Sequence, residues 1–363
     1  MDNFLRKLCF LKDKFKCLRL NLDHKRDFGQ VIPFVLFLSV IFSILILNNF
    51  SQKVLATAGA DWTQATDSAG WDGRRGHTSV VFNNKMWVIG GEDESYNDLN
   101  DVWYSTDGVN WTQATDSAGW SGRFEHISVV FNNKMWVMGG ADAGFDDFND
   151  VWYSTDGVNW TQATASAGWD VRIDPTSVVF DNKMWVMGGG IYSCWDYESW
   201  YNDVWYSTDG VNWTQATDSA GWGIRFLHTS VVFDNKMWVM GGETYYDGKY
   251  YCGVNDVWYS TDGVNWTQAT ASAGWHGREA HTSVVFDNKM WVMGGCYWDD
   301  GHHCTNDVWY STDGVNWTQA TASAGWHGRG GHTSVVFKNR MWMIGGGASR
   351  NDVWYSSSDI WNP

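Results

Sequence analysis

Three carboxylates stand where the other copies of a repeated sequence have different residues. Glu125, Asp174 and Glu279 each follow, by one or two positions, an arginine that recurs in every copy. Two carboxyl groups in one pocket can act as general acid and general base, so these three are candidate catalytic residues. The repeated arginines are better explained by structural pairing between copies of the repeat. They are Arg74, Arg123, Arg172, Arg225, Arg278 and Arg329.

Aromatic and acidic residues are concentrated in one segment of the repeat, between a Gly-Gly pair and the next Asp-Val-Trp. This segment has 9, 9, 13, 13 and 11 residues in the first five copies, and is cut short in the sixth. Aromatic rings and carboxylates suit sugars and protein partners alike, and the aromatics can also pack on one another. The candidate ligand-binding residues are Tyr192, Trp195, Tyr197, Trp200, Tyr245, Tyr246, Tyr250, Tyr251, Tyr297, Trp298, Asp299 and Asp300.

Four of the six cysteines fall in the same segments. Cys296 and Cys304 share one segment, whereas Cys194 and Cys252 belong to consecutive copies. In an oxidising compartment we expect two disulfides, Cys194–Cys252 and Cys296–Cys304. The alternative is a metal site formed by Cys296 and Cys304 with His302 and His303. The disulfides are favoured because the spacing matches no zinc ribbon or finger.

The unit that carries these residues is about fifty residues long and occurs six times from Asp61 onward. Its D/N-W-T-Q-A-T phrase places tryptophans 49, 49, 53, 53 and 51 residues apart. Each spacing equals 40 residues plus the variable segment, so all insertions fall in one loop. A constant scaffold with one variable loop is how repeat proteins form binding surfaces. The tryptophans are Trp62, Trp111, Trp160, Trp213, Trp266 and Trp317.

Each unit predicts four short strands. In the first unit they are residues 77–82, 86–89, 101–104 and 111–115, separated by turn sequences. Four strands repeated six times predict an all-β, six-bladed β-propeller. Residues 61–66 repeat the fourth strand without a blade before them, and the sixth copy lacks that strand. We therefore expect residues 61–66 to complete the sixth blade.

The unit resembles the kelch repeat of β-propellers. The resemblance rests on Arg74 and His77, the Gly90-Gly91 pair, Asn-Asp-Val-Trp-Tyr at 100–104 and Trp111. It covers about residues 61–361 and implies four-stranded kelch-like blades, with the loops after strands two and four on one face. Kelch propellers include oxidases, epimerases and binding proteins, so the resemblance leaves the function open.

The sequence from Ser105 to Trp111 is similar to the Asp-box of sialidases, S-x-D-x-G-x-x-W, but is one residue shorter. In such a turn Ser and Asp bond backbone amides and Gly takes a positive φ, which implies a structural role. A sialidase would also need three convergent arginines and a tyrosine nucleophile. A galactose-oxidase-like enzyme would need two tyrosines and two histidines around copper, and the sequence does not define that set.

The N-terminal residues differ from the repeats. Residues 1–30 carry eight Lys/Arg and are expected to stay in the cytoplasm, while residues 31–50 are uncharged and long enough to form one transmembrane helix. Residues 51–60 form a linker to the propeller at 61–363. Alternatively, residues 31–50 are the apolar region of a signal peptide cleaved near Ala58. We expect a single-pass cell-membrane protein with the propeller outside, or a secreted propeller.

Charge limits the partners. After residue 58 the chain has 16 Lys/Arg and 37 Asp/Glu, a formal charge of −21. Such a surface disfavours nucleic acids and anionic membranes. We expect a monomer without a cofactor that binds a glycan or an extracellular protein through its variable loops. The alternative is an extracytoplasmic carbohydrate-active enzyme, a sialidase-like hydrolase or a galactose-oxidase-like oxidase. Convergence of Glu125, Asp174 and Glu279, or of the two loop histidines, in one pocket would favour it.

Overall fold

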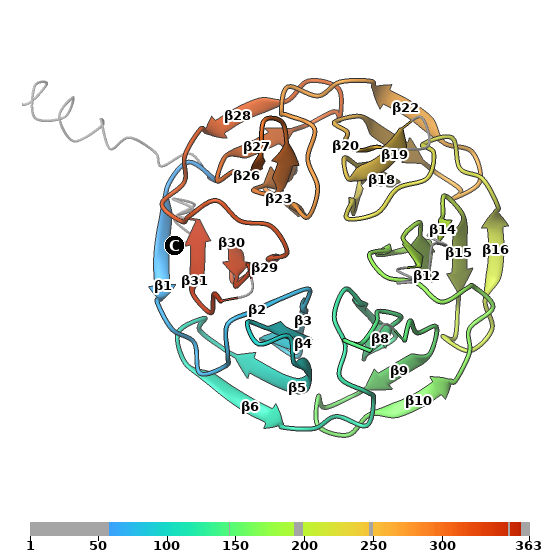
Figure 1. The fold of residues 1–363 in the computed structure, drawn as a ribbon, viewed down its shortest axis with the longest axis vertical. Helices are drawn as coiled ribbons and strands as arrows, with labels where there is room; N and C mark the ends of the chain where they lie inside the picture. The colour runs from blue at the N-terminus through green and yellow to red at the C-terminus, as the bar shows by residue number, and fades with distance from the viewer. Residues whose placement is uncertain (1–57, 145, 192–198, 247–249, 348, 357–363) are drawn as a thin grey trace, which may run out of the picture. The chain divides into compact units, whose positions relative to one another are not determined.

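The computed structural model describes residues 58–363, apart from 145, 192–198, 247–249, 348 and 357–363. The described residues form six blades arranged in a ring, each an antiparallel sheet (Figure 1). This confirms the predicted all-β, six-bladed propeller. The predicted transmembrane segment at 31–50 lies outside the described residues. Within the described part, no helix is long and apolar enough to cross a membrane.

Each blade begins with an innermost strand followed by a fully buried second strand. The innermost strands read T-S-V-V-F or I-S-V-V-F, and they are β3 (Thr78–Phe82), β7 (Ile127–Phe131), β11 (Thr176–Phe180), β17 (Thr229–Phe233), β23 (Thr282–Phe286) and β29 (Thr333–Phe337). The second strands are β4 (Lys85–Asp93), β8 (Lys134–Met138), β12 (Lys183–Met187), β18 (Lys236–Met240), β24 (Lys289–Met293) and β30 (Arg340–Ile344). Their run of buried apolar residues is typical of a strand covered on both faces.

The outer half of each blade consists of a V-W-Y-S strand and a W-T-Q-A-T strand. The third strands are β5 (Asp98–Ser105), β9 (Val151–Ser154), β15 (Val204–Ser207), β21 (Val257–Ser260), β27 (Val308–Ser311) and β31 (Val353–Ser356). The fourth strands are β6 (Trp111–Thr115), β10 (Thr161–Thr164), β16 (Thr214–Thr217), β22 (Thr267–Thr270), β28 (Thr318–Thr321) and β1 (Trp62–Thr66). The fourth strands form the outer rim of the ring (Figure 1).

The first strand of the chain closes the ring. β1 pairs antiparallel with β31, with Trp62 opposite Ser356 and Gln64 opposite Trp354. The sixth blade is therefore the sheet β1-β31-β30-β29. This confirms the closure predicted from residues 61–66, and it gives the third strand of the last blade a hydrogen-bonded neighbour.

The core lies between neighbouring blades. Val80 and Phe82 of the first blade pack with Met135 and Val137 of the second, together with Trp120 from the connection between them. The same arrangement recurs around the described ring, and the connecting tryptophans are almost completely buried. Apolar side chains packed in this way at near-crystalline density fix the angle between blades.

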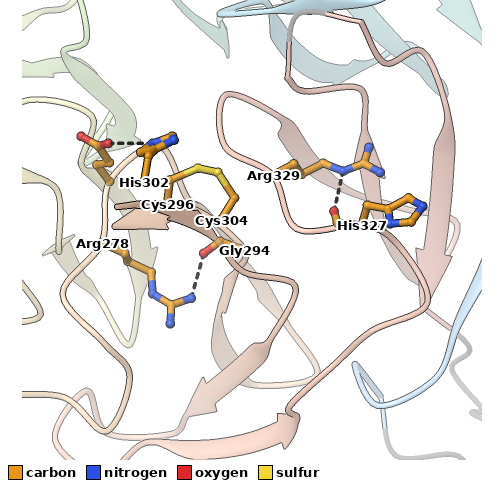
Figure 2. Close-up of a disulfide and its surroundings, with 8 residues drawn as sticks. Arg278, Gly294, Cys296, His302, Cys304, His327 and Arg329 are labelled. Atoms are coloured by element: carbon orange, nitrogen blue, oxygen red, sulfur yellow. Dashed lines mark hydrogen bonds and ion pairs between the residues drawn. A yellow bond between two sulfur atoms is a disulfide. The ribbon is translucent and has the colours of Figure 1, made fainter. Parts of the chain in front are cut away.

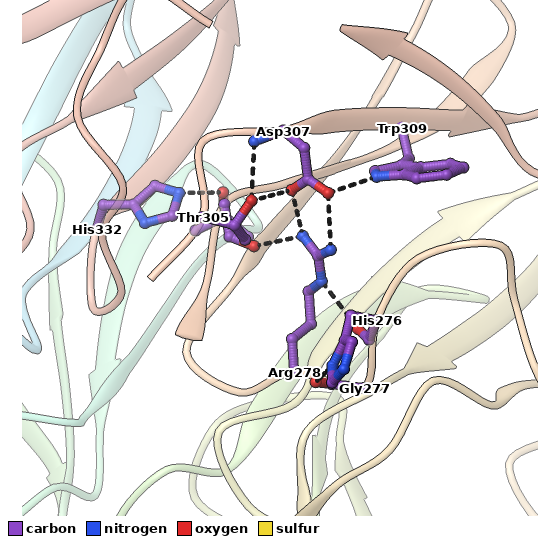
Figure 3. Close-up of polar contacts among 9 residues, drawn as sticks. His276, Gly277, Arg278, Thr305, Asp307, Trp309 and His332 are labelled. Atoms are coloured by element: carbon purple, nitrogen blue, oxygen red, sulfur yellow. Dashed lines mark hydrogen bonds and ion pairs between the residues drawn. The ribbon is translucent and has the colours of Figure 1, made fainter. Parts of the chain in front are cut away.

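The repeated arginines anchor each connection to the blade that follows it. Figure 3 shows the fifth blade, where Arg278 donates two hydrogen bonds to Asp307, at 2.7 and 2.9 Å, and a third to the carbonyl of Gly294. Trp309 also donates to Asp307, at 2.7 Å. The pair lies within one blade. The prediction that the repeated arginines pair between blades is therefore wrong. The predicted structural role of the arginine stands.

The turn between strands three and four has the expected bonding. In the first blade the Ser105 hydroxyl accepts from the Gly108 amide at 2.8 Å, and Asp107 accepts from two further amides. Gly108 has φ +78°, and a Cβ there would lie 2.0 Å from the ring of Trp342 in the neighbouring blade. The glycine is required by backbone conformation and by packing.

Three blades carry an extra hairpin in the variable segment. The hairpin of the third blade pairs β13 (Gly190–Ile191) with β14 (Ser199–Trp200). That of the fourth pairs β19 (Glu243–Tyr246) with β20 (Tyr250–Gly253). That of the fifth pairs β25 (Cys296–Trp298) with β26 (His302–Cys304). In the first blade, the short strand β2 (Arg74–Arg75) pairs with the end of β4. The paired strands of these hairpins therefore extend the three blades beyond their four main strands.

Candidate functional site

Six equivalent residues surround the channel, each two positions after a repeated arginine. We call them the channel ring, and they are Gly76, Glu125, Asp174, Leu227, Ala280 and Gly331. All six have left-handed backbone, with φ between 52° and 63°. Amide–carbonyl hydrogen bonds join neighbours of the ring, for example Glu125 to Gly76 at 2.8 Å and Asp174 to Glu125 at 3.1 Å. Non-glycine residues seldom adopt this conformation. The ring therefore holds their side chains at fixed places around the opening.

Two further residues of each blade complete its edge of the opening. One directly precedes the channel-ring residue, and the other directly follows the Gly-Gly pair. The two residues pair with each other through a short β-bridge. In the first blade these are Arg75 and Glu92, in the fourth Phe226 and Glu243, and in the fifth Glu279 and Cys296. The sixth blade contributes only Gly330, Gly331 and Gly347. Different side chains on identical backbone make the opening strongly asymmetric.

The structure brings the three predicted carboxylates together. Glu125, Asp174 and Glu279 line one cavity of about 350 Å³ in the channel, which we call the channel cavity. Glu125 shares a side-chain hydrogen bond with Asp174. Glu279 shares one with Glu243. Two carboxyl groups can form such a bond only when one of them holds a proton, so the opening contains two carboxyl pairs that each retain a proton.

Burial raises the pKa values of Glu125, Asp174 and Glu243, and nearby carboxylates add to the rise. The pKa of Glu125 rises to about 7, chiefly because of burial, while the nearby Arg75 opposes the rise and Glu92 adds to it. Burial raises the pKa of Asp174 well above its usual range, and the charges of Glu125 and Glu279 add to the effect. The pKa of Glu243 rises to about 9 through burial and its bond to Glu279. Near pH 7 Glu125 is therefore about half protonated, and Glu243 is mostly protonated.

A larger cavity of about 720 Å³ opens beside the channel cavity, and we call it the mouth cavity. The two cavities share four lining residues, namely Arg75, Glu125, Asp174 and Leu227. The volume is typical of sites for small ligands or single side chains. Its remaining lining is mainly apolar or aromatic and includes Tyr96, Phe124, Ala141, Ala143, Ile173, Trp200 and Phe226, with Glu92 and Glu243.

Aromatic side chains form one wall of the mouth cavity. Trp200, from the hairpin of the third blade, stacks on Phe226 of the fourth with ring centres 3.8 Å apart. On the opposite side Tyr96 is 66% exposed and lies 5.7 Å from the guanidinium of Arg75. Arg75 itself is bound to Glu92 at 2.7 Å. The main positive charge of this cavity is therefore already paired.

Below the channel ring lies a layer of buried histidines. His77, His126 and His332 each bond through Nε2 to a threonine of the preceding blade, at 3.0 to 3.1 Å. The Nε2 atoms of His228 and His281 have no such partner. Burial and a neighbouring arginine lower the pKa of every one of these five histidines, so they are neutral near pH 7.

The hairpin of the fifth blade contains the expected disulfide between Cys296 and Cys304 (Figure 2). Nε2 of His302 lies 3.7 Å from a carboxylate oxygen of Glu279. Ligand atoms of Cys296, His302 and Cys304 lie within 4.8 Å of one another. These three residues have the spacing to hold a metal ion, but only when both cysteines are reduced. His303 instead bonds Asp300 at 2.9 Å, at the hairpin turn.

The remaining predicted residues are distributed unevenly. Trp298 is 62% exposed beside His302, Tyr297 packs against His276, and Asp299 and Asp300 are exposed at the turn. Tyr245, Tyr246, Tyr250, Tyr251 and Cys252 lie on the backbone of β19 and β20. Tyr192, Cys194, Trp195 and Tyr197 lie outside the described residues, as does the proposed Cys194–Cys252 bond.

Glu92, Tyr96 and Glu243 are among the residues of the mouth cavity that the sequence analysis did not identify. Glu92 and Glu243 directly follow Gly-Gly pairs, where other copies have Ala, Gly or Cys. Comparing the copies at that position would have identified both glutamates. Tyr96 has a left-handed φ of 61°, and nothing in the repeat marks it.

The sequence matches the KLHDC2/KLHL20/DRC7 Kelch-repeats domain family over residues 52–242 and 176–362, and the chain belongs to this kelch-repeat family. It is similar to Kelch domain-containing protein 3 of Rattus norvegicus and of Mus musculus, each 26% identical over 151 residues. Those residues are 38% of this chain and 36% of the relative, so the match spans about a third of each.

Among solved structures, the one titled "Structure of YjhT" aligns with a TM-score of 0.64. It is 14% identical, and the alignment covers 80% of this chain and 96% of the other. At that identity the likeness concerns the fold alone.

Proposed function

We propose that this chain is an exported, membrane-anchored binding module whose ligand docks on the variable-loop face of the propeller, at the mouth cavity. One observation carries the proposal. The six copies are nearly identical, and their differences at the opening, directly after the arginines and directly after the Gly-Gly pairs, line one pair of adjoining cavities. A scaffold that varies mainly around a single opening is typical of recognition proteins.

The ligand class follows from the exposed groups. Exposed aromatics such as Tyr96 and Trp298, next to carboxylates, suit a glycan or an extracellular protein. Kelch propellers commonly serve as protein-interaction modules. The proposal keeps residues 1–30 in the cytoplasm and residues 31–50 in the cell membrane. If the chain is cleaved near Ala58, the same module is secreted.

A glycan and surface-protein array tests this function. The full-length chain in mild detergent is compared with a variant in which the β25–β26 hairpin is shortened to the length found in the sixth blade. We expect the full-length chain to capture a ligand and the shortened variant to capture less of it. Equal capture by both chains would contradict docking at this face, provided that both give the same circular dichroism spectrum.

A carbohydrate-active enzyme is the second candidate, because a carboxyl group with a pKa of about 7 is suited to general acid–base catalysis. Glycosidases separate their two carboxyls by roughly 5 to 9.5 Å. Glu125 and Asp174 are hydrogen-bonded and therefore closer, so a hydrolase would have to pair one of them with Glu279 or Glu243. Turnover of glycans by the full-length chain, abolished in Glu125→Gln, would establish the enzyme. A galactose-oxidase-like reaction would instead require bound copper, which metal analysis measures.

A further inference from the structure

We propose that the mouth cavity binds a primary ammonium group carried on an aliphatic chain, as in a lysine side chain of a partner protein or a free polyamine. The ammonium group would lie against the two carboxyl pairs, and the aliphatic chain against the wall formed by Trp200, Phe226 and Leu227. The inference rests on the proposed function, because the group enters by the same opening.

The charge of the cavity favours a cation. Arg75 is neutralised by Glu92 at 2.7 Å. Each carboxyl pair, Glu125 with Asp174 and Glu243 with Glu279, carries one negative charge when it holds a single shared proton. The repeated arginines of the described blades are buried and bound to their own aspartates, so they offer no charge to an anionic ligand. A carboxylate or phosphate ligand would face net repulsion here.

The shape of the cavity favours an aliphatic stem. The rings of Trp200 and Phe226 stack with their centres 3.8 Å apart, and both residues line the cavity together with Ile173 and Leu227. An alkyl chain buried against such apolar side chains is removed from water, which favours binding. Lysine has four methylenes between its backbone and its ammonium group, so it joins an aliphatic stem to a cationic end.

The layer below offers an acceptor for the same ligand. His228 and His281 are 7% and 5% exposed and line the adjoining channel cavity. Their Nε2 atoms have no hydrogen-bond partner, unlike those of His77, His126 and His332. A neutral imidazole has one acceptor nitrogen, and an ammonium group has three donors and no acceptor. This is an observation separate from the acidic residues, and it points to the same kind of ligand.

Binding must be linked to pH. An ammonium group stabilises ionised carboxylates, so it displaces the shared protons, and affinity should rise between pH 6 and pH 8 while the ammonium remains charged. The charged groups that act on the pairs belong to several blades. They are Arg75, Glu92, Asp147, Glu243, Glu279 and, beside Glu279, His302.

Isothermal titration of the full-length chain tests the inference. The probe is Nα-acetyl-lysine N-methylamide, and the matched control is its Nε-acetylated form. We expect the probe to bind at least tenfold more tightly than the control at pH 8, and more tightly at pH 8 than at pH 6. Glu125→Gln and Asp174→Asn should each weaken binding about tenfold, whereas Asp300→Asn, at an exposed turn outside both cavities, should not change it.

Cadaverine distinguishes the two sources of the group. Tighter binding of cadaverine than of the lysine amide identifies a free amine, and the reverse identifies a protein side chain; both support the inference. Equal affinity for the probe and its acetylated form would overturn it. A protein captured on the array is also tested after its lysines are acetylated. Unchanged binding would contradict the ammonium site but would leave the proposed binding function intact.

Discussion

Glu125 and Asp174 hold equivalent positions in neighbouring blades, and their side chains share a hydrogen bond at the mouth of the channel. The backbone amide of Asp174 also donates to the carbonyl of Glu125, at 3.1 Å. The same ring that joins the blades therefore forces two carboxyl groups together. This places Glu125, whose pKa burial raises to about 7, where the sequence of the repeat varies.

The carboxyl pairs should make the fold less stable in alkali. Glu125 and Glu243 have raised pKa values, of about 7 and about 9, so the folded chain holds protons that the unfolded chain has already lost. The free energy of unfolding should therefore fall as pH rises from 7 to 9.5, by at most about 1.4 kcal/mol per pH unit for each proton. Urea denaturation across this range measures it.

Glu243→Gln should flatten that decline, because its amide does not titrate. The buried histidines interfere little above about pH 8, since an unfolded-state pKa of about 6.5 leaves them almost fully neutral in both states there. An unchanged slope in the variant would show that Glu243 keeps an ordinary pKa.

Gly108→Ala should destabilise the propeller strongly. The new Cβ would lie 2.0 Å from the ring of Trp342, and φ is +78°. We expect a loss of about 3 kcal/mol, from overpacking together with backbone strain. Gly223→Ala is the matched control, because φ is +74° there and nothing lies within 4 Å. It should cost only about 1 kcal/mol. If the two variants lose the same stability in thermal denaturation, the close approach of residue 108 to Trp342 does not contribute to the loss in Gly108→Ala.

Asp307→Ala should cost about 3 to 5 kcal/mol, because it leaves the guanidinium of Arg278, 1% exposed, without its carboxylate. Asp300→Ala breaks the pair with His303 at an exposed turn, where water screens the charges, and should leave the stability nearly unchanged. Denaturant midpoints of the two variants give the comparison. Similar midpoints would contradict the structural role of the repeated arginines.

Non-reducing peptide mapping by mass spectrometry should recover Cys296 linked to Cys304. It also tests the Cys194–Cys252 pairing expected from the sequence. Because the 296–304 bond closes a short loop, Cys296→Ser with Cys304→Ser should lower stability by no more than about 3 kcal/mol and leave the propeller folded. Global unfolding of the double variant would show that the hairpin does more than stiffen the face.

The fold was predictable because the repeat marks its own strands and turns. The clearest case is residues 61–66, a fourth strand without a blade, which is observed as β1 beside β31. The Arg278–Asp307 pair was harder to assign, because one sequence cannot show which acidic residue meets a repeated arginine. Strand geometry placed the partner in the same blade.

The sequence analysis named convergence of the three carboxylates only as a result that would favour the enzyme alternative. It could not predict the convergence itself, because that depends on backbone conformation. Leu227 and Ala280 adopt φ of 53° and 52° without any glycine to indicate it. Glu92 and Glu243 enter the cavity through bridges to Arg75 and Phe226, which directly precede channel-ring residues, so they could be found only by comparing the copies one position after each Gly-Gly pair.

The central claim, that the ligand occupies the mouth cavity, is tested most directly by filling that cavity. Ala143 lines it and is exposed, so Ala143→Trp should be tolerated and should block it. Val109→Trp adds the same side chain at an exposed turn between strands three and four, away from the cavity. The account predicts that Ala143→Trp binds the ligand captured on the array at least tenfold more weakly, while Val109→Trp binds it normally. Unchanged binding by Ala143→Trp, with an unchanged melting temperature, would contradict it.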